Sequence, residues 1–162
     1  MLGRIIRRVH GRFTATRKGA SLLAPERAGE LCVLLVHTVL RKLNLAVFLW
    51  LDIDVAPLQW TIGYTLKVLS GLSEGWHDVS AISDALVLPA VREMLPPDGP
   101  SHLRGCIIRS VLVAPLCWIG VLEMSTDRYP APELVRKTPL FDRLIQFHLD
   151  VPVPIIHGSD RA

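Results

Sequence analysis

The residues of this chain that could do chemistry are basic side chains, gathered near both ends of the sequence. Residues 1–18 carry six Arg and Lys residues and no acid, whereas the remainder holds 12 basic and 15 acidic residues. Arg and Lys neutralise phosphates, and Arg can make a forked hydrogen bond to guanine. The candidate DNA-binding residues are therefore Arg7, Arg8, Arg12, Arg17, Lys18, His102, Arg104, Arg109, Arg128, Arg136 and Lys137. A solvated strand and turn is an equally good interpretation of the N-terminal group.

No catalytic or metal-binding pattern emerges from the other polar residues. His77 and Asp78 are an adjacent acid–base pair, but we expect Asp78 to cap a helix. Asp52 and Asp54 resemble a paired-carboxylate site, although two acids between two helices are usually a solvated turn. His37, inside an apolar stretch, is expected to be a hydrogen-bonded core residue. The sequence predicts a non-enzymatic protein with no cofactor, no metal and no evident small-molecule substrate.

Cysteine and tryptophan are expected in the core. The cysteines are odd in number and have no close pair, which favours small apolar core residues in a reducing compartment. The tryptophans are expected to pack in the core and not to form a stacking platform. These residues are Cys32, Cys106, Cys117, Trp50, Trp60, Trp76 and Trp118.

The candidate residues after residue 101 are positioned by a helix that leads into a strand. Ser101 is expected to cap this helix, and Leu103, Ile107, Val111 and Ala114 recur at helical spacing on its core face. Pro115 and Gly120 are expected to break this helical period. Strands follow at 121–124 and 134–138, with a polar tip at 125–133 and a closing helix at 140–149 that begins after Thr138-Pro139. This order predicts a winged helix-turn-helix over residues 57–149.

The N-terminal candidates lie on a predicted hairpin and short helix. Strands at 4–9 and 12–16 flank His10-Gly11, and Thr16 caps a helix over 17–23. A long apolar helix follows at 25–50, with a kink or pause near Asn44, and further helices are expected at 58–73 and 79–94. The predicted divisions are a remnant wing hairpin and helix at 1–24, the apolar helix at 25–56, the winged helix-turn-helix at 57–149 and a tail at 150–162. A chain that opens on a wing is expected to be a truncated fragment.

Four short motifs between residues 11 and 148 are distinctive: Gly11–Leu23, Leu40-Arg41-Lys42-Leu43-Asn44-Leu45, Trp118–Glu123 and Lys137-Thr138-Pro139-Leu140-Phe141. Together they resemble the helical, winged-helix-containing region of uncharacterised bacterial proteins that often carry a plasmid ORF-three-like domain. The resemblance covers residues 11–148. Phe141 stands where that family usually has Gly, and the ORF-three-like domain is not found in this sequence. The resemblance implies a fold and no activity.

The fold class expected is α+β, predominantly α, with a winged helix, extra N-terminal helices and a remnant hairpin. Hydrophobic residues make up 50% of the chain, but no clean apolar run reaches the length of a membrane-spanning helix. We therefore expect a cytoplasmic protein. Two functions remain open: a DNA-binding or regulatory module for double-stranded DNA, or an interaction domain. In the second case the apolar helix 31–51 forms a homo-oligomer or contacts a missing N-terminal domain.

Overall fold

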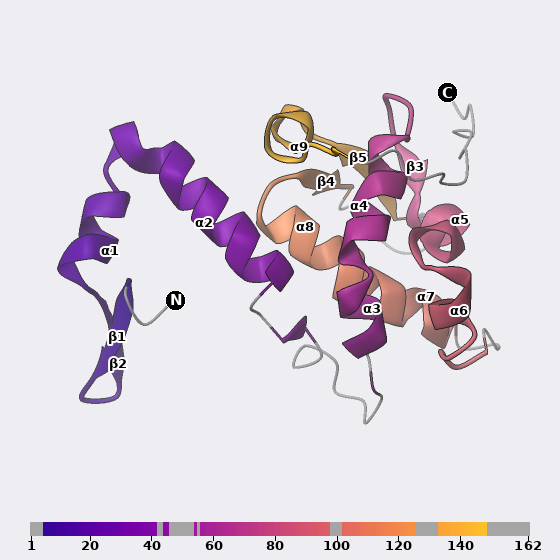
Figure 1. Cartoon of the computed structure of the whole chain (residues 1–162), viewed down its shortest axis with the longest axis horizontal. Coiled ribbons are helices and arrows are strands. Elements are labelled where there is room, and N and C mark those ends of the chain that lie inside the picture. The colour runs from indigo at the N-terminus through magenta and orange to yellow at the C-terminus, as the bar shows by residue number, and fades with distance from the viewer. Residues whose placement is uncertain are drawn as a thin grey trace. The chain divides into compact units, whose positions relative to one another are not determined.

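A computed structural model describes residues 5–41, 44–45, 54, 56–97, 102–125 and 133–148. For Ile6, Arg7, Arg8 and Phe13 it describes the backbone alone. The chain divides into two compact units, Met1–Leu43 (unit 1) and Asn44–Ala162 (unit 2). The elements are labelled in Figure 1. Several expectations lie outside the described residues: the Ser101 cap, Asp52, Trp50, the wing tip with Arg128, and the tail.

Unit 1 begins with an antiparallel hairpin, as the sequence predicted. His10 and Gly11 both have positive φ (47° and 79°), which is the conformation that a two-residue type I′ turn requires. Ile6 lies opposite Ala15, and Val9 lies opposite Arg12. The elements of unit 1 are β1 (Ile6–Val9), β2 (Arg12–Ala15), α1 (Arg17–Leu22), the 3-10 turn η2 (Pro25–Arg27) and α2 (Ala28–Arg41).

Thr16 joins the hairpin to α1. Its backbone N–H and its hydroxyl both donate to the Ile5 carbonyl, at 2.7 and 3.0 Å, and its Oγ1 accepts the N–H of Gly19 at 3.1 Å. Gly19 is buried beneath this junction, and a Cβ there would lie 2.8 Å from Ile5 Cγ2 and 2.9 Å from the Ile5 carbonyl carbon. The close approach of α1 to Ile5 therefore requires glycine at position 19.

The predicted apolar helix over 25–50 is realised as η2 followed by α2. Pro25 lies in the first turn of η2, and Asn44 is outside any helix, where the sequence predicted a kink or pause. Residues 42–43 and 46–53 lie outside the described part. Val33 and Leu35 are 58% and 42% exposed, so α2 presents aliphatic side chains at its surface.

Unit 2 is mainly helical and carries a small antiparallel sheet, which confirms the α+β, mostly α class. The sheet has three strands in the order β3-β5-β4, so the last strand in sequence lies in the middle. The elements are α3 (Ala56–Trp60), α4 (Ile62–Ser70), β3 (His77–Asp78), α5 (Val79–Ser83), η4 (Asp84–Leu86), α6 (Pro89–Arg92), α7 (Leu103–Ile108), the π-helical turn η5 (Arg109–Val113), α8 (Ala114–Trp118), β4 (Leu122–Met124), β5 (Leu134–Lys137) and α9 (Pro139–Leu144).

The central helical run of unit 2 is α7, η5 and α8, which follow one another without a break (Figure 1). The helical period breaks just before Pro115, as the sequence predicted, but the helix itself continues to Trp118. Proline has no N–H to donate, and the helix continues past Pro115 because a wider π-helical turn, η5, precedes it. Ala114 donates to the carbonyl of Arg109, five residues back, and Pro115 then lies in the first turn of α8. Ile107 and Val111 are buried as predicted, whereas Ala114 is half-buried. The run also buries Ile108, Leu112, Val113, Pro115 and Leu116.

The hairpin of unit 2 repeats the junction seen in unit 1. Thr138 donates its N–H to the Val121 carbonyl at 3.1 Å and its hydroxyl to the Gly120 carbonyl at 2.7 Å. Its Oγ1 also accepts the N–H of Leu140 at 3.3 Å, so Thr138 caps α9 as the sequence predicted. The helix ends at Leu144, five residues before the predicted end, because the backbone becomes extended at Ile145.

Two other predicted helices are interrupted. The helix over 58–73 is divided at Thr61 into α3 and α4 and ends at Ser70. The helix over 79–94 is divided into α5, η4 and α6, with Pro89 starting the last piece. Asp78 caps α5 as expected, accepting the N–H of Ser80 at 2.8 Å. Each break changes which side chains of the adjoining helices face the core. This is one reason why Trp60, expected in the core, is exposed.

Candidate nucleic-acid interface

Three basic side chains of unit 1 are exposed on adjacent elements. Arg12 begins β2, and Arg17 and Lys18 form the first turn of α1, immediately after the Thr16 cap. None of the three takes part in an ion pair in the part of the chain that the structure describes. Their charge is therefore available to an anionic partner.

The acids of unit 1 do not neutralise this group. Glu30 is held by Arg27, which donates from Nε and Nη2 at 3.1 and 2.6 Å. These hydrogen bonds lower the pKa of Glu30, and the charge of Lys18 adds a smaller effect in the same direction. Arg7 and Arg8 belong to β1, opposite Thr14 and Phe13, and their side chains lie outside the described residues.

The candidates on the helix of unit 2 are bound within the unit. Arg104 is half-buried and donates its Nε to the Pro96 carbonyl at 3.1 Å. Arg109, also half-buried, forms an ion pair with Glu133. His102 is exposed and precedes α7 with a positive φ of 48°. Of these three residues, His102 alone has no side-chain hydrogen bond or ion pair in the described part of the chain, and the exposed residue one turn further on is Cys106.

The candidates on β5 are also held internally. Arg136 lies opposite Glu123, and its Nε donates to Glu123 Oε2 at 2.8 Å. Its guanidinium also lies over the ring of Trp76, 4.5 Å from the centroid. Lys137 donates its Nζ to the Ser70 carbonyl at 3.0 Å. Among the described residues of unit 2, the structure thus does not bring the predicted basic side chains onto one free surface.

The partners of these cations were missed from the sequence. The Glu123–Arg136 contact could have been predicted from the sequence, because opposite charges at facing positions of two predicted strands are expected to pair. The other partners could not be predicted in this way. Trp76 and Glu133 are distant in sequence from Arg136 and Arg109, and the Pro96 carbonyl meets Arg104 through a loop whose path the sequence does not define.

Several other expected core residues are at the surface. Trp60 and Trp118 are 81% and 57% exposed, and His37 and Cys106 are exposed. Trp76 is half-buried against Arg136. The prediction of a core position is wrong for Trp60, Trp118, His37 and Cys106. For Trp60 and Trp118, the regular helical pattern does not include the interruptions at Thr61 and at the π-helical turn η5. The three cysteines are unpaired thiols, and burial raises the pKa of Cys117 to about 11.

The residues considered for catalysis have structural partners. His77 is buried and its Nε2 lies 3.0 Å from the Ser73 carbonyl oxygen, whereas Asp78 caps α5. Asp54 accepts the N–H of Ala56 at 3.0 Å, at the start of α3. No group of three or more His, Cys, Asp and Glu side chains among the described residues is arranged to hold a metal ion.

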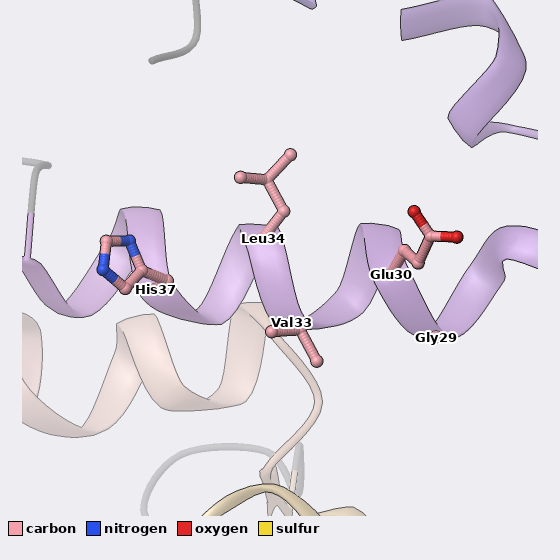
Figure 2. A pocket seen from close by; sticks show the side chains of 5 residues that line it. All are labelled: Gly29, Glu30, Val33, Leu34 and His37. Atoms are coloured by element: carbon pink, nitrogen blue, oxygen red, sulfur yellow. The ribbon is translucent and has the colours of Figure 1, made fainter. Parts of the chain in front are cut away.

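A pocket is lined by one face of α2 (Figure 2), formed by Gly29, Glu30, Val33, Leu34 and His37. Glu30 and His37 are its ionisable residues. They are seven positions apart, which is about 10 Å along a helix axis, too far for a shared hydrogen bond. Glu30 is also engaged by Arg27. The pocket therefore offers an aliphatic surface and no acid–base pair.

The chain was compared with protein-family models, curated proteins and solved structures, and no significant match was found. Within the ranges that the structure describes, no helix is both long and apolar enough to cross a membrane.

Proposed function

We propose that the chain is a non-enzymatic nucleic-acid-binding module that contacts the phosphates of double-stranded DNA through unit 1. The observation that supports this proposal is the exposed group of Arg12, Arg17 and Lys18, without ion-pair partners among the described residues. Phosphate neutralisation dominates the affinity of most DNA-binding surfaces, and it requires cations that are not already paired.

We further propose that unit 2 is a winged helix whose wing is structural. Helices α3 and α4 precede β3, α5 follows, the α7–α8 run leads into β4, and β5 returns between β3 and β4. This order supports the assignment and agrees with the resemblance noted for residues 11–148. Arg104, Arg109, Arg136 and Lys137 are occupied by internal contacts, which favours unit 1 over unit 2 as the phosphate-binding surface.

Matched variants of the full chain test the proposal. One variant replaces Arg12, Arg17 and Lys18 with Ala. The control replaces Arg41, Arg92 and Arg143, which removes the same net charge from other positions. We expect the first variant to bind a random DNA duplex at least tenfold more weakly than the control at low salt. Equal affinity of the two variants would place DNA contact elsewhere.

A second candidate function is association through α2, favoured by Val33, which is 58% exposed and lines the pocket on this helix together with Leu34. An apolar face of this kind is typical of a protein-interaction surface. Sedimentation velocity over a range of concentrations tests it. Self-association that is lost in Val33→Glu would support this function, and a concentration-independent monomer would exclude homo-oligomers through this helix.

A further inference from the structure

A hairpin followed by a threonine-capped helix occurs twice in this chain with the same backbone hydrogen bond at the junction. The threonine hydroxyls differ, because that of Thr16 donates to the Ile5 carbonyl at 3.0 Å and that of Thr138 donates to the Gly120 carbonyl at 2.7 Å. The N–H of Thr16 donates to the Ile5 carbonyl at 2.7 Å, and the N–H of Thr138 donates to the Val121 carbonyl at 3.1 Å. In each case the acceptor is the residue just before the first strand of the hairpin.

The strand register of the two hairpins is also the same when counted from the threonine. The last three facing pairs of unit 1 correspond one by one to the three pairs of β4 and β5. The pairs of unit 1 are Ile6↔Ala15, Arg7↔Thr14 and Arg8↔Phe13, and those of unit 2 are Leu122↔Lys137, Glu123↔Arg136 and Met124↔Val135. Strand β2 therefore has the place in unit 1 that β5 has in unit 2.

The two motifs differ at the outer edge of this strand. In unit 2, β3 pairs with β5, with His77 opposite Val135 and Asp78 opposite Leu134. The counterparts of Val135 and Leu134 in unit 1 are Phe13 and Arg12. In the part of unit 1 that the structure describes, the sheet has two strands, β1 and β2.

The backbone of β2 presents hydrogen-bonding groups at this edge. Facing pairs of an antiparallel ladder are alternately hydrogen-bonded and not, and the pair next to a two-residue turn is hydrogen-bonded. Val9 and Arg12 flank such a turn. The next residue, Phe13, therefore directs its N–H and C=O away from β1, as Val135 does toward β3. A lone two-stranded hairpin is marginally stable, and an open edge favours pairing with another strand.

We propose that the outer edge of β2 accepts a third strand from a second polypeptide, an extended acidic segment that runs antiparallel to β2. It pairs with the backbone of Phe13 and places a carboxylate opposite Arg12, as Asp78 lies opposite Leu134 in unit 2. The exposed charges of Arg12, Arg17 and Lys18 favour an acidic segment. The same charges disfavour a second copy of unit 1 at this edge, because two groups of cations would be brought together. This inference shares Arg12, Arg17 and Lys18 with the proposed DNA contact, but it also requires the backbone of Phe13, which the DNA contact does not, so the two can be tested separately.

A peptide taken from the chain itself provides the probe. Residues 74–83 (EGWHDVSAIS) contain β3 and its acidic residue. The peptide is added to the full chain labelled with ¹⁵N, and amide shifts and hydrogen exchange are followed. We expect shifts at Arg12 and Phe13, slower exchange of the Phe13 amide, and weaker binding of a peptide in which Lys replaces the residue corresponding to Asp78.

Two chain variants separate edge pairing from other contacts. Phe13→Pro removes the outward N–H and leaves the hydrogen bonds between β1 and β2, whereas Phe13→Leu retains that N–H. Loss of one hydrogen bond predicts roughly fivefold weaker peptide binding for the proline variant than for the leucine variant. Both variants are expected to bind DNA as the unchanged chain does, so failure of this inference is distinguishable from failure of the proposed function.

Three results would overturn the inference. The first is the absence of shifts at Arg12 and Phe13 with peptide at about 1 mM, the range in which weak strand pairing is detectable. The second is shifts confined to unit 2. The third is slow exchange of the Phe13 amide in the chain alone, which would mean that the edge is already occupied.

Discussion

Replacing Gly19 with Ala is expected to disrupt the junction between the hairpin and α1. The added Cβ meets the backbone of Ile5, which Thr16 holds by two hydrogen bonds. If Ile5 moves away, both bonds are lost, at about 1 kcal/mol each. The greater helix propensity of Ala offsets at most about 1 kcal/mol of this cost. We therefore expect a net local destabilisation of about 1 kcal/mol or more.

Gly29→Ala is the matched control in the same unit. Gly29 is a helical residue of α2 with no atom within 4 Å of the added Cβ, so the same substitution is expected to be neutral or to stabilise by up to about 1 kcal/mol. Native-state hydrogen exchange at the amides of Thr16 and Ala20 reads out the local free energy. Protection that falls in Gly19→Ala and not in Gly29→Ala would support the close approach of α1 to Ile5. Equal or greater protection in Gly19→Ala would refute it.

Three further predictions concern unit 2. Thr138→Val removes a hydroxyl that donates to the Gly120 carbonyl and caps α9. Urea unfolding should therefore show a free energy of unfolding that is lower by about 1–2 kcal/mol, and Thr138→Ser should largely retain the original value. An equal decrease in both variants would contradict the role of the hydroxyl. With a thiol reagent at pH 8, the exposed Cys106 should react rapidly and Cys117 slowly, because burial raises the pKa of Cys117 to about 11 and leaves that thiol mostly protonated. The reaction rate of Cys117 should rise about tenfold per pH unit. Equal rates for the two thiols would count against the burial of Cys117. A Cβ added at Gly105 in α7 lies in open space, so Gly105→Ala should raise the free energy of unfolding by up to about 1 kcal/mol. A lower unfolding midpoint in urea would contradict this open space around position 105.

The local elements with turn or cap chemistry were predictable from the sequence. His10-Gly11 indicated the first hairpin, Thr16 and Thr138 indicated the starts of α1 and α9, and Asp78 indicated the start of α5. In each case the residue acts on its immediate neighbours, so no knowledge of the tertiary structure was needed.

Burial was predicted less well where a helix changes phase. Trp60 was expected in the core, but the predicted helix over 58–73 is interrupted at Thr61, and Trp60 is 81% exposed. The π-helical turn before Pro115 has the same effect on Trp118, which is 57% exposed. Hydrophobic periodicity assumes a regular helix, and one added residue per turn moves every later side chain to another face.

The candidate site was predictable as a list of cations and not as a surface. The sequence identified the basic residues, but it did not identify which of them have internal partners. Arg109 meets Glu133 and Lys137 meets the Ser70 carbonyl through contacts between distant segments. Those contacts follow from the tertiary fold, and they narrow the proposed phosphate-binding surface from candidates in both units to unit 1.

The salt dependence of DNA binding tests the central claim most directly. Each phosphate contact contributes about −0.9 to the slope of log affinity against log salt concentration. If Arg12, Arg17 and Lys18 each neutralise a phosphate, the slope of the unchanged chain should be steeper than that of the triple Ala variant by roughly three such contributions, about 2.7. The control variant of Arg41, Arg92 and Arg143 should keep the steeper slope. Identical slopes for the unchanged chain and the triple variant, or no binding at low salt, would contradict the account.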